Sequence, residues 1–187
     1  MVTITCKKRT GALDKTAGQL RREGYIPYVM YSKGQESQSG VVPQTEMEAI
    51  LRSLRPGFLP TTQFALKDEN GNVQNAIIRE IQYEPTTYAV IHLDFMRLIE
   101  GVHVDVKVPV EYVNAVDCIG VKLGGFLRSV MRHIEVRCLP ENIPSHFDVD
   151  VKELGICQSR RVKDIVIPAT VTCLADASEV VVSVAKK

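Results

Sequence analysis

The eight residues Gly101-Val102-His103-Val104-Asp105-Val106-Lys107-Val108 carry a valine at every second position, with glycine, histidine, aspartate and lysine between. A period of two is that of a β-strand whose alternate side chains face a core and water. The rest of the 187-residue chain also consists largely of short β-prone runs separated by glycine and proline. The sequence therefore predicts a mainly β protein with a minor α-helical part.

Downstream of this stretch, the chain keeps its β-prone character to the end. Four further strands are predicted, at His133–Cys138, Phe147–Val151, Val162–Val166 and Val180–Ala185. Their spacing is typical of a β-sandwich or a β-barrel. Because the pattern changes near Leu98–Gly101 without a long linker, we predict two domains, residues 1–97 and an all-β domain of residues 98–187.

Upstream of the same stretch, short β-prone runs recur with turn residues between them. The turn Asp68-Glu69-Asn70-Gly71 predicts a β-hairpin, whereas Tyr25-Ile26-Pro27 predicts a break in regular structure. The predicted strands are Val2–Cys6, Tyr28–Tyr31, Gly40–Val42, Thr61–Lys67, Val73–Gln82 and Tyr88–Phe95.

Two short helices are predicted in the first domain. Asp14 is placed to cap a helix that runs through Glu23 and ends at Gly24. Thr45-Glu46-Met47-Glu48 has the spacing of a capping box, in which Thr45 and Glu48 satisfy each other's backbone donors. The second helix should end near Leu54, before a proline.

Composition excludes several classes of protein. The longest uncharged stretch in the last quarter, residues 165–175, has 11 residues, whereas a membrane-spanning helix needs about 20. The N-terminus also lacks the apolar segment of a signal peptide, so we expect a cytoplasmic protein. The sequence holds no phosphate-binding P-loop, dinucleotide fingerprint or nucleophile elbow. No cofactor and no small-molecule substrate are therefore expected.

The cysteines do not form a metal or disulfide pattern. Cys6, Cys118, Cys138, Cys157 and Cys173 are odd in number, widely spaced and not near a histidine at zinc-ligand spacing. We expect five reduced, mostly buried thiols and no metal site.

Charge is distributed unevenly although the whole chain carries only +1. Residues 1–34 hold seven basic and two acidic side chains, a formal charge of +5. Residues 35–99 carry −3 and residues 100–187 carry −1. This distribution is compatible with a surface that faces a polyanion, but on charge alone a solvated charge run is the favoured interpretation.

The sharpest local feature is His92-Leu93-Asp94-Phe95. On a strand, His92 and Asp94 share one face while Leu93 and Phe95 point into the core. From spacing alone the pair can be a structural hydrogen bond, an RNA contact, or the base of a hydrolase. No nucleophile or metal cluster accompanies it, which counts against catalysis. Arg79 and Gln82, three apart on the preceding strand, should face opposite sides unless a bulge intervenes.

Motifs over nearly the whole chain resemble those of one family, in the same order. Gln19-Leu-Arg-Arg-Glu-Gly-Tyr-Ile-Pro27 is similar to the signature Leu-Arg-x-x-Gly-x-Ile-Pro-Ala-Val-x-Tyr-Gly, with Tyr31 following. Ile81-Gln82 with Pro85, and then Ile91–Phe95, resemble its Val-Gln-x-x-Pro and His-x-Asp-Phe block. Its two-domain form is matched by Val108–Val110, Gly120–Gly125, Cys138–Pro140 and Asp148–Val151. The family is that of the bacterial large-subunit ribosomal protein that binds 5S rRNA, the Ctc general-stress family.

The resemblance implies a six-stranded N-terminal β-barrel with a few short helices, which grips 5S rRNA, and a C-terminal all-β domain. It also implies a structural, non-enzymatic role in the large ribosomal subunit, next to neighbouring ribosomal proteins. Carried over to this chain, the RNA-binding positions are Arg9, Lys15, Arg21, Tyr31, Arg79, Gln82, His92 and Asp94.

The chain departs from the family where basic residues are common. Leu13, Asp14, Gly18, Gln19, Tyr83 and Glu84 stand at such positions, so we expect weaker binding of 5S rRNA than for a typical member. A protein-interaction or stress-related module with incidental RNA contact is the alternative.

Overall fold

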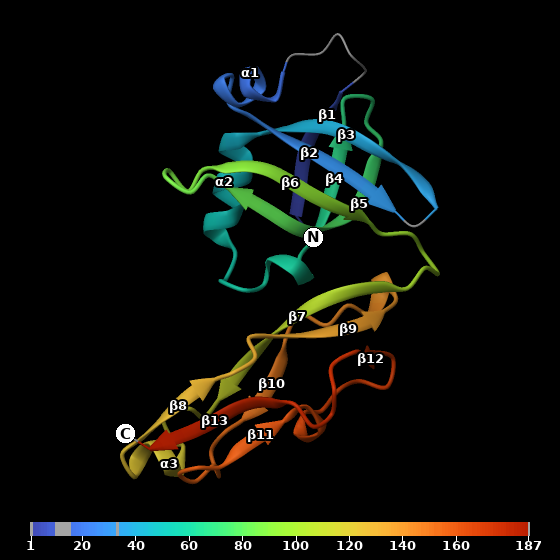
Figure 1. Ribbon diagram of the computed structural model, residues 1–187. Helices are drawn as coiled ribbons and strands as arrows, with labels where there is room; N and C mark the ends of the chain where they lie inside the picture. Colours follow the sequence, from blue (N-terminus) through green and yellow to red (C-terminus); the bar gives the residue numbers. More distant parts are fainter. Residues whose placement is uncertain (1, 10–15, 33, 187) are drawn as a thin grey trace. The chain divides into compact units, whose positions relative to one another are not determined.

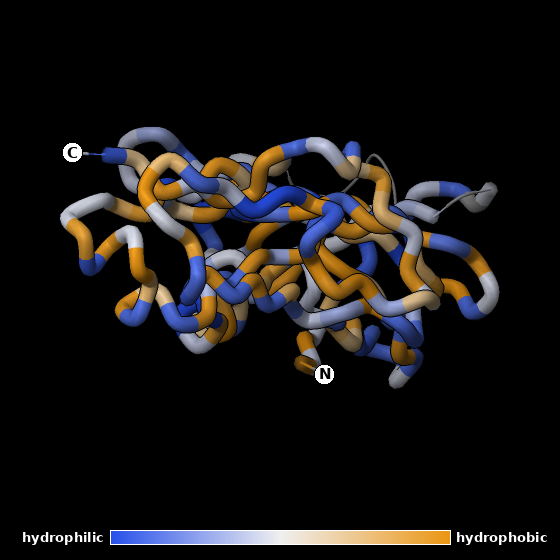
Figure 2. The backbone as a smooth tube through the Cα atoms, turned by 90° about the horizontal axis from the view of Figure 1, so that it is seen from below, coloured by the Kyte–Doolittle hydropathy of each residue, from blue (hydrophilic) through white to orange (hydrophobic). Residues whose placement is uncertain are grey.

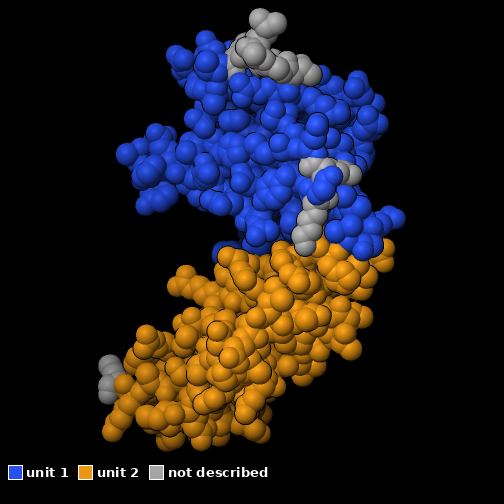
Figure 3. Space-filling model, turned by 45° about the vertical axis from the view of Figure 1, so that its right-hand side comes forward, with its two compact units in different colours: residues 1–102 blue, residues 103–187 orange. Residues whose placement is uncertain are grey.

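The computed structural model describes residues 2–9, 16–32 and 34–186. The chain divides into two compact units, residues 1–102 and residues 103–187, which are coloured separately in Figure 3. Along the backbone, hydrophilic and hydrophobic residues follow one another in short steps (Figure 2), as expected of strands with one buried face.

The first unit is a closed six-stranded β-barrel (Figure 1). Its strands lie in the order β1-β3-β2-β6-β5-β4, so closure leaves no strand edge exposed. The pairs β1–β4 and β2–β6 are parallel and the other four are antiparallel. The predicted barrel is confirmed. The strands are β1 (Val2–Lys8), β2 (Tyr25–Ser32), β3 (Gln35–Pro43), β4 (Gln63–Asp68), β5 (Val73–Tyr83) and β6 (Val90–Arg97).

Three aromatic rings lie at the centre of the barrel core. Phe95 on β6 packs edge-on against Tyr28, with ring centroids 5.5 Å apart, and against Phe64 at 6.1 Å. All three rings are buried, and Leu93 is buried beside them. The inward face predicted for Leu93 and Phe95 is therefore confirmed.

Two α-helices and a short 3₁₀-helix, η1 (Leu59–Thr61), accompany the barrel. The first, α1 (Ala17–Arg22), is capped by Thr16, whose side chain accepts from the Gln19 N–H while the Gln19 side chain returns the bond. The prediction of Asp14 as the cap was therefore wrong, and Asp14 itself lies outside the described residues. The capping box is formed two residues further on, by the Thr16 hydroxyl at the N-cap and the Gln19 side-chain amide at N3, which are residue types that form such a box.

The second helix, α2 (Gln44–Ser53), begins one residue before the predicted capping box. Its first N–H, that of Gln44, donates to the carbonyl of Gly24 at 2.8 Å. The Glu48 carboxylate accepts from the Gln44 side chain at 2.7 Å instead of reaching back to Thr45. The predicted capping box was therefore wrong. The first N–H of the helix is satisfied instead by the carbonyl of Gly24, which is distant in sequence. The helix packs Met47, Ile50 and Leu51 against the barrel core.

The segment Tyr25–Pro27 is part of β2, so the predicted break there was also wrong. The strand pairs with β3 through this segment, where Pro27 lies opposite Val41. Pairing with β6 on the other side begins only at Tyr28. A proline without an N–H is therefore tolerated at this point of the strand.

The second unit consists of two sheets. One has the order β10-β7-β9-β12 and the other β11-β13-β8. The alternating valines of residues 101–108 lie on β7 from Val104 onward, where Val104, Val106 and Val108 are buried. The elements are β7 (Val104–Val113), α3 (Ile119–Lys122), β8 (Gly125–Ser129), β9 (His133–Cys138), the 3₁₀-helix η2 (Pro140–Asn142), β10 (Phe147–Asp150), β11 (Ser159–Arg161), η3 (Val162–Asp164), β12 (Thr172–Cys173) and β13 (Val180–Lys186).

The predicted strand Val162–Val166 is not a strand, because the chain forms η3 there. The Asp164 carboxylate accepts from the Arg161 N–H at 2.9 Å and closes the turn. Val162 and Ile165 are both buried, and a spacing of three is the period of a 3₁₀-helix. A β-branched run at this length does not distinguish the two structures from sequence alone.

All five cysteines are unpaired; Cys6, Cys118 and Cys138 are buried and Cys157 is exposed. Burial raises the pKa of the Cys6 and Cys138 thiols. Within the described ranges, no helix has the length and apolar composition to cross a bilayer.

The β4–β5 hairpin carries an ion pair that makes stability depend on pH. Lys8 Nζ lies 2.8 Å from Asp68 Oδ2, and this contact lowers the pKa of Asp68. A lowered folded pKa stabilises the fold above the ordinary aspartate value, and the gain is lost as pH falls through the folded pKa. We expect Lys8→Met to destabilise the barrel at pH 6 and to flatten the loss of stability below about pH 4.

Thermal unfolding of the wild type and Lys8→Met at a series of pH values measures this effect. Lys7→Met is the matched control, because Lys7 pairs at 3.1 Å with the exposed Glu69. Parallel pH profiles for Lys8→Met and the wild type would show that the Asp68 pair does not contribute.

Candidate nucleic-acid interface

One outer face of the barrel collects most of the predicted contact residues. It is formed by the outward side chains of β2, β6 and β5, which lie side by side in the barrel (Figure 1). We call this face the outer wall and define it by Tyr31, Arg79, Gln82, His92 and Asp94.

The centre of the outer wall is formed by β6. Because Leu93 and Phe95 fill the core, His92 and Asp94 point outward. Their side chains are in contact, with His92 Nδ1 2.7 Å from Asp94 Oδ1, and each remains about a quarter exposed, 23% and 28%. The pair thus offers polar groups on a firmly held strand, and rigid strands position side chains better than loops.

A β-bulge on β5 decides which of its residues join the outer wall. Ile78 lies opposite Phe95, and Glu80, not Arg79, lies opposite Asp94. Arg79 is the extra residue, and its guanidinium Nη1 lies 3.9 Å from Met96 Sδ on β6. Gln82 then falls opposite His92. Arg79 and Gln82 therefore share the outer face although three residues separate them, because the bulge changes the alternation.

The two tyrosines of β2 have different roles. Tyr28 lies inside the barrel, where burial and the Cys6 side chain raise the pKa of its hydroxyl. Tyr31 lies beside Met96 on the outer wall. Its pKa is raised by burial, with Asp94 and Glu80 adding to the effect and Arg79 opposing it. The Tyr31 hydroxyl therefore stays protonated at neutral pH and can both donate and accept.

Helix α1 places Arg21 at the margin of the outer wall. Its Nε donates to the carbonyl of Ile91 at 2.9 Å, although 70 residues separate them. Ile91 directly precedes His92, so the guanidinium and the imidazole lie on the same side of the barrel. The bond uses one of the five guanidinium N–H donors.

Arg9 and Lys15 belong to the N-terminal segment. The backbone N–H of Arg9 donates to the carbonyl of Ser39 at 3.0 Å. Ser39 on β3 lies opposite Val29 on β2. Arg9, which directly follows β1, is therefore separated from the outer wall by β3. Lys15 lies outside the described residues, as does Leu13.

Glu80 is a residue that sequence reasoning missed. It lies opposite Asp94 in register, so two carboxylates face each other on the outer wall, an arrangement that like charges disfavour. Arg79, next in sequence, supplies a positive charge beside them. Alternation along β5 places Glu80 on the outer face only if the bulge at Arg79 is taken into account, and the sequence alone does not show that bulge.

The arrangement does not form a hydrolase site. His92 and Asp94 line neither of two hollows on the first unit, one between α2 and the β5–β6 hairpin and a small one beside Ser32. The pair lies on an open strand face, and its neighbours Gln82 and Met96 are not nucleophiles. Polar groups on an open face fit recognition of a large partner.

Comparison with known proteins finds one family model for each of the two units. The model of the "Ribosomal L25p family" matches residues 4–95, and that of "Ribosomal protein TL5, C-terminal domain" matches residues 103–187. A "Large ribosomal subunit protein bL25" of Chlamydia abortus is 43% identical over 169 residues, which cover 90% of this chain and 91% of that protein. The protein of the same name from Chlamydia pneumoniae is 40% identical over the same shares. The chain therefore belongs to the ribosomal L25p family, in its form with a TL5-type C-terminal domain, and is a structural ribosomal protein, not an enzyme.

Proposed function

We propose that the chain binds 5S rRNA through the outer wall, as a constituent of the large subunit of cytoplasmic ribosomes. The observation that carries the proposal is the bulge at Arg79, which gathers Arg79, Gln82, His92 and Asp94 on one face beside Tyr31. The large-subunit proteins of Chlamydia that resemble the chain over 90% of its length support the ribosomal setting.

The chemistry of the outer wall suits a folded RNA helix. A-form RNA presents a wide, shallow minor groove with 2′-hydroxyls and base edges. An open strand face with amide, imidazole, carboxylate and phenol groups can hydrogen-bond such a groove. Cationic side chains at the margin, above all Arg21, meet the phosphates beside it.

We assign RNA binding to residues 1–97 and a separate task, contact with neighbouring ribosomal proteins, to residues 98–187. Support comes from the second unit, where Val116, Leu123 and Phe126 are large, apolar and at least half exposed. Exposed apolar side chains of this kind are common at protein interfaces.

A gel shift with purified 5S rRNA tests both assignments. We expect the full chain to shift 5S rRNA at low salt, and a chain ending at residue 97 to keep that affinity within about two-fold, because few phosphate contacts are lost. No shift by the full chain at low salt would refute 5S rRNA binding. A large loss on truncation would instead show that the second domain takes part.

A further inference from the structure

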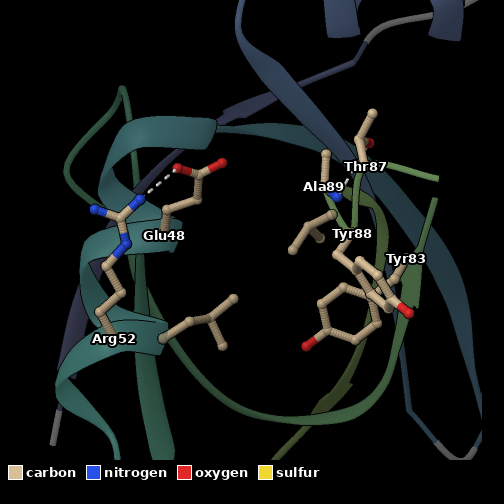
Figure 4. Close-up of a pocket in the computed structure, with 8 residues that line it drawn as sticks. Glu48, Arg52, Tyr83, Thr87, Tyr88 and Ala89 are labelled. Carbon is tan, nitrogen blue, oxygen red and sulfur yellow. Dashed lines mark hydrogen bonds and ion pairs between the residues drawn. The ribbon is translucent and has the colours of Figure 1, made fainter. Parts of the chain in front are cut away.

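The second unit carries a group of side chains of the kinds that bind metal ions. Within residues 2–9, 16–32 and 34–186, Glu111, His146 and Asp148 are the one such group of three whose ligand atoms all lie within 4.8 Å of one another. None of them belongs to the outer wall, and none lines the hollow between α2 and the β5–β6 hairpin (Figure 4). We call these three residues the β7–β10 cluster.

The pairing of two parallel strands brings the two carboxylates of the cluster together. β10 and β7 lie side by side (Figure 1), and Asp148 stands opposite Glu111 in register. Phe147 and Val149, on either side of Asp148, are buried. The Asp148 and Glu111 side chains therefore lie on the outer face of the sheet. His146 directly precedes β10.

The imidazole of His146 turns one nitrogen toward both carboxylates. His146 Nε2 lies 3.5 Å from Asp148 Oδ1 and 4.0 Å from Glu111 Oε2. The ligand atoms of a tetrahedral Zn²⁺ site lie about 3.3 Å apart, since each is about 2.0–2.2 Å from the metal. The side chains of Asp148, Glu111 and His146 are 62%, 35% and 32% exposed, so small rotations can close this difference.

The other ring nitrogen of His146 is held by a residue outside the cluster. His146 Nδ1 lies 2.9 Å from Ser145 Oγ. When Nδ1–H donates to this hydroxyl, the lone pair of the imidazole is on Nε2, the nitrogen that faces the carboxylates. Metal-binding histidines almost always donate their second N–H to a neighbouring acceptor, which fixes the tautomer and the orientation of the ring. This bond is independent support for Nε2 as a ligand atom.

The charges of the cluster also favour a cation. Two carboxylates that face each other on adjacent strands repel, and a neutral imidazole does not offset their charge. A divalent ion between them does. Imidazole together with carboxylate suits Zn²⁺ and similar first-row ions, whereas Mg²⁺ and Ca²⁺ prefer oxygen ligands alone.

We propose that the β7–β10 cluster binds one Zn²⁺-type ion, with water in the fourth position of a tetrahedron. The ion ties β10, a four-residue strand at the edge of its sheet, to β7. The site goes beyond RNA binding and does not depend on it. The absence of a metal site was predicted from cysteine spacing, which carries no information about a site made of carboxylates and imidazole.

Titration of the full chain with Co²⁺, a coloured substitute for Zn²⁺, tests the site. We expect saturation at one ion per chain, with the visible spectrum of nitrogen and oxygen ligands and without the near-ultraviolet charge-transfer band of a thiolate. That band matters because Cys157 is exposed. His146→Gln should weaken binding at least about 100-fold. Ser145→Ala should weaken it about ten-fold, as expected when the hydrogen-bond partner of a ligating histidine is removed.

His133→Gln is the matched control. His133 lies on β9 opposite Pro109, and Ile134 beside it is buried, so His133 occupies the same outer face of the sheet without belonging to the cluster. Its replacement should leave Co²⁺ binding unchanged. Zn²⁺ should raise the melting temperature of the second unit in the wild type and in His133→Gln, but not in His146→Gln.

Three results would overturn the metal site. The first is that the wild type binds no Co²⁺ at millimolar concentration, and the second is a thiolate band in the spectrum of the bound ion. The third arises if His146 is instead the imidazolium partner of the two carboxylates. His146→Gln would then lower the melting temperature of the metal-free chain, and Zn²⁺ would not change that of the wild type.

Discussion

Replacement of Phe95 by alanine is expected to lower the free energy of unfolding of the first unit by about 4 kcal/mol. Phe95 is fully buried, and its ring packs edge-on against those of Tyr28 and Phe64. Alanine would leave a cavity at the centre of a closed barrel, whose ladder of hydrogen bonds resists collapse. Urea unfolding followed by circular dichroism measures the loss.

The control for this change is Phe126→Ala in the second unit. Phe126 is 50% exposed on β8, so its truncation should cost less than about 1 kcal/mol. Because the chain has two compact units, Phe95→Ala should shift only the transition of the first. A loss of similar size for both variants would show that the Phe95 ring is not central to the barrel.

Replacement of Arg21 by alanine is expected to weaken 5S rRNA binding by about 2 kcal/mol, roughly 30-fold. The salt dependence of binding should fall by about one unit of slope, because one phosphate contact is lost. We expect this large loss of affinity because the hydrogen bond from Arg21 Nε to the Ile91 carbonyl holds the guanidinium beside His92. Gel shifts between low and moderate salt give both quantities.

Arg22 provides a matched control one residue away. Its Nε donates to the Gly18 carbonyl within its own helix at 3.2 Å and so does not tie it to β6. Arg22→Ala removes the same charge and should cost only a few-fold in affinity. Equal losses for the two arginines would mean that α1 contributes general electrostatic attraction and that the outer wall does not orient the RNA.

His92→Ala should differ from Arg21→Ala in its effect on the salt dependence of binding. The imidazole meets a groove and not a phosphate in the proposed complex, so affinity should fall by about 1 kcal/mol while the salt slope stays unchanged. A reduced slope for this variant would place a phosphate at His92 and contradict the groove contact.

Local patterns predicted the strands well because the inward face of a strand is a local property. The alternation Val104, Val106, Val108 and the pair Leu93, Phe95 both place apolar side chains inside. The hairpin turn at Asp68–Gly71 also follows from local chemistry, since Gly71 takes a positive φ there.

Two of the errors, those at α2 and at Pro27, fall where a distant group completes a local structure. Helix α2 begins at Gln44 because the Gly24 carbonyl, twenty residues earlier, accepts its N–H. Pro27 stays in a strand because the neighbouring strand β6 does not yet pair there. Neither partner is visible in a window of sequence around the element.

Two β units, the inward faces of their strands and membership of the L25p family follow from the amino-acid sequence, because alternation and motif order are properties of the chain. The outer wall depends instead on contacts between distant strands. Tyr31 lies beside Met96, and Arg21 reaches Ile91, through contacts that span more than sixty residues. The bulge at Arg79 has the same origin, since a change of register is defined only by the partner strand β6.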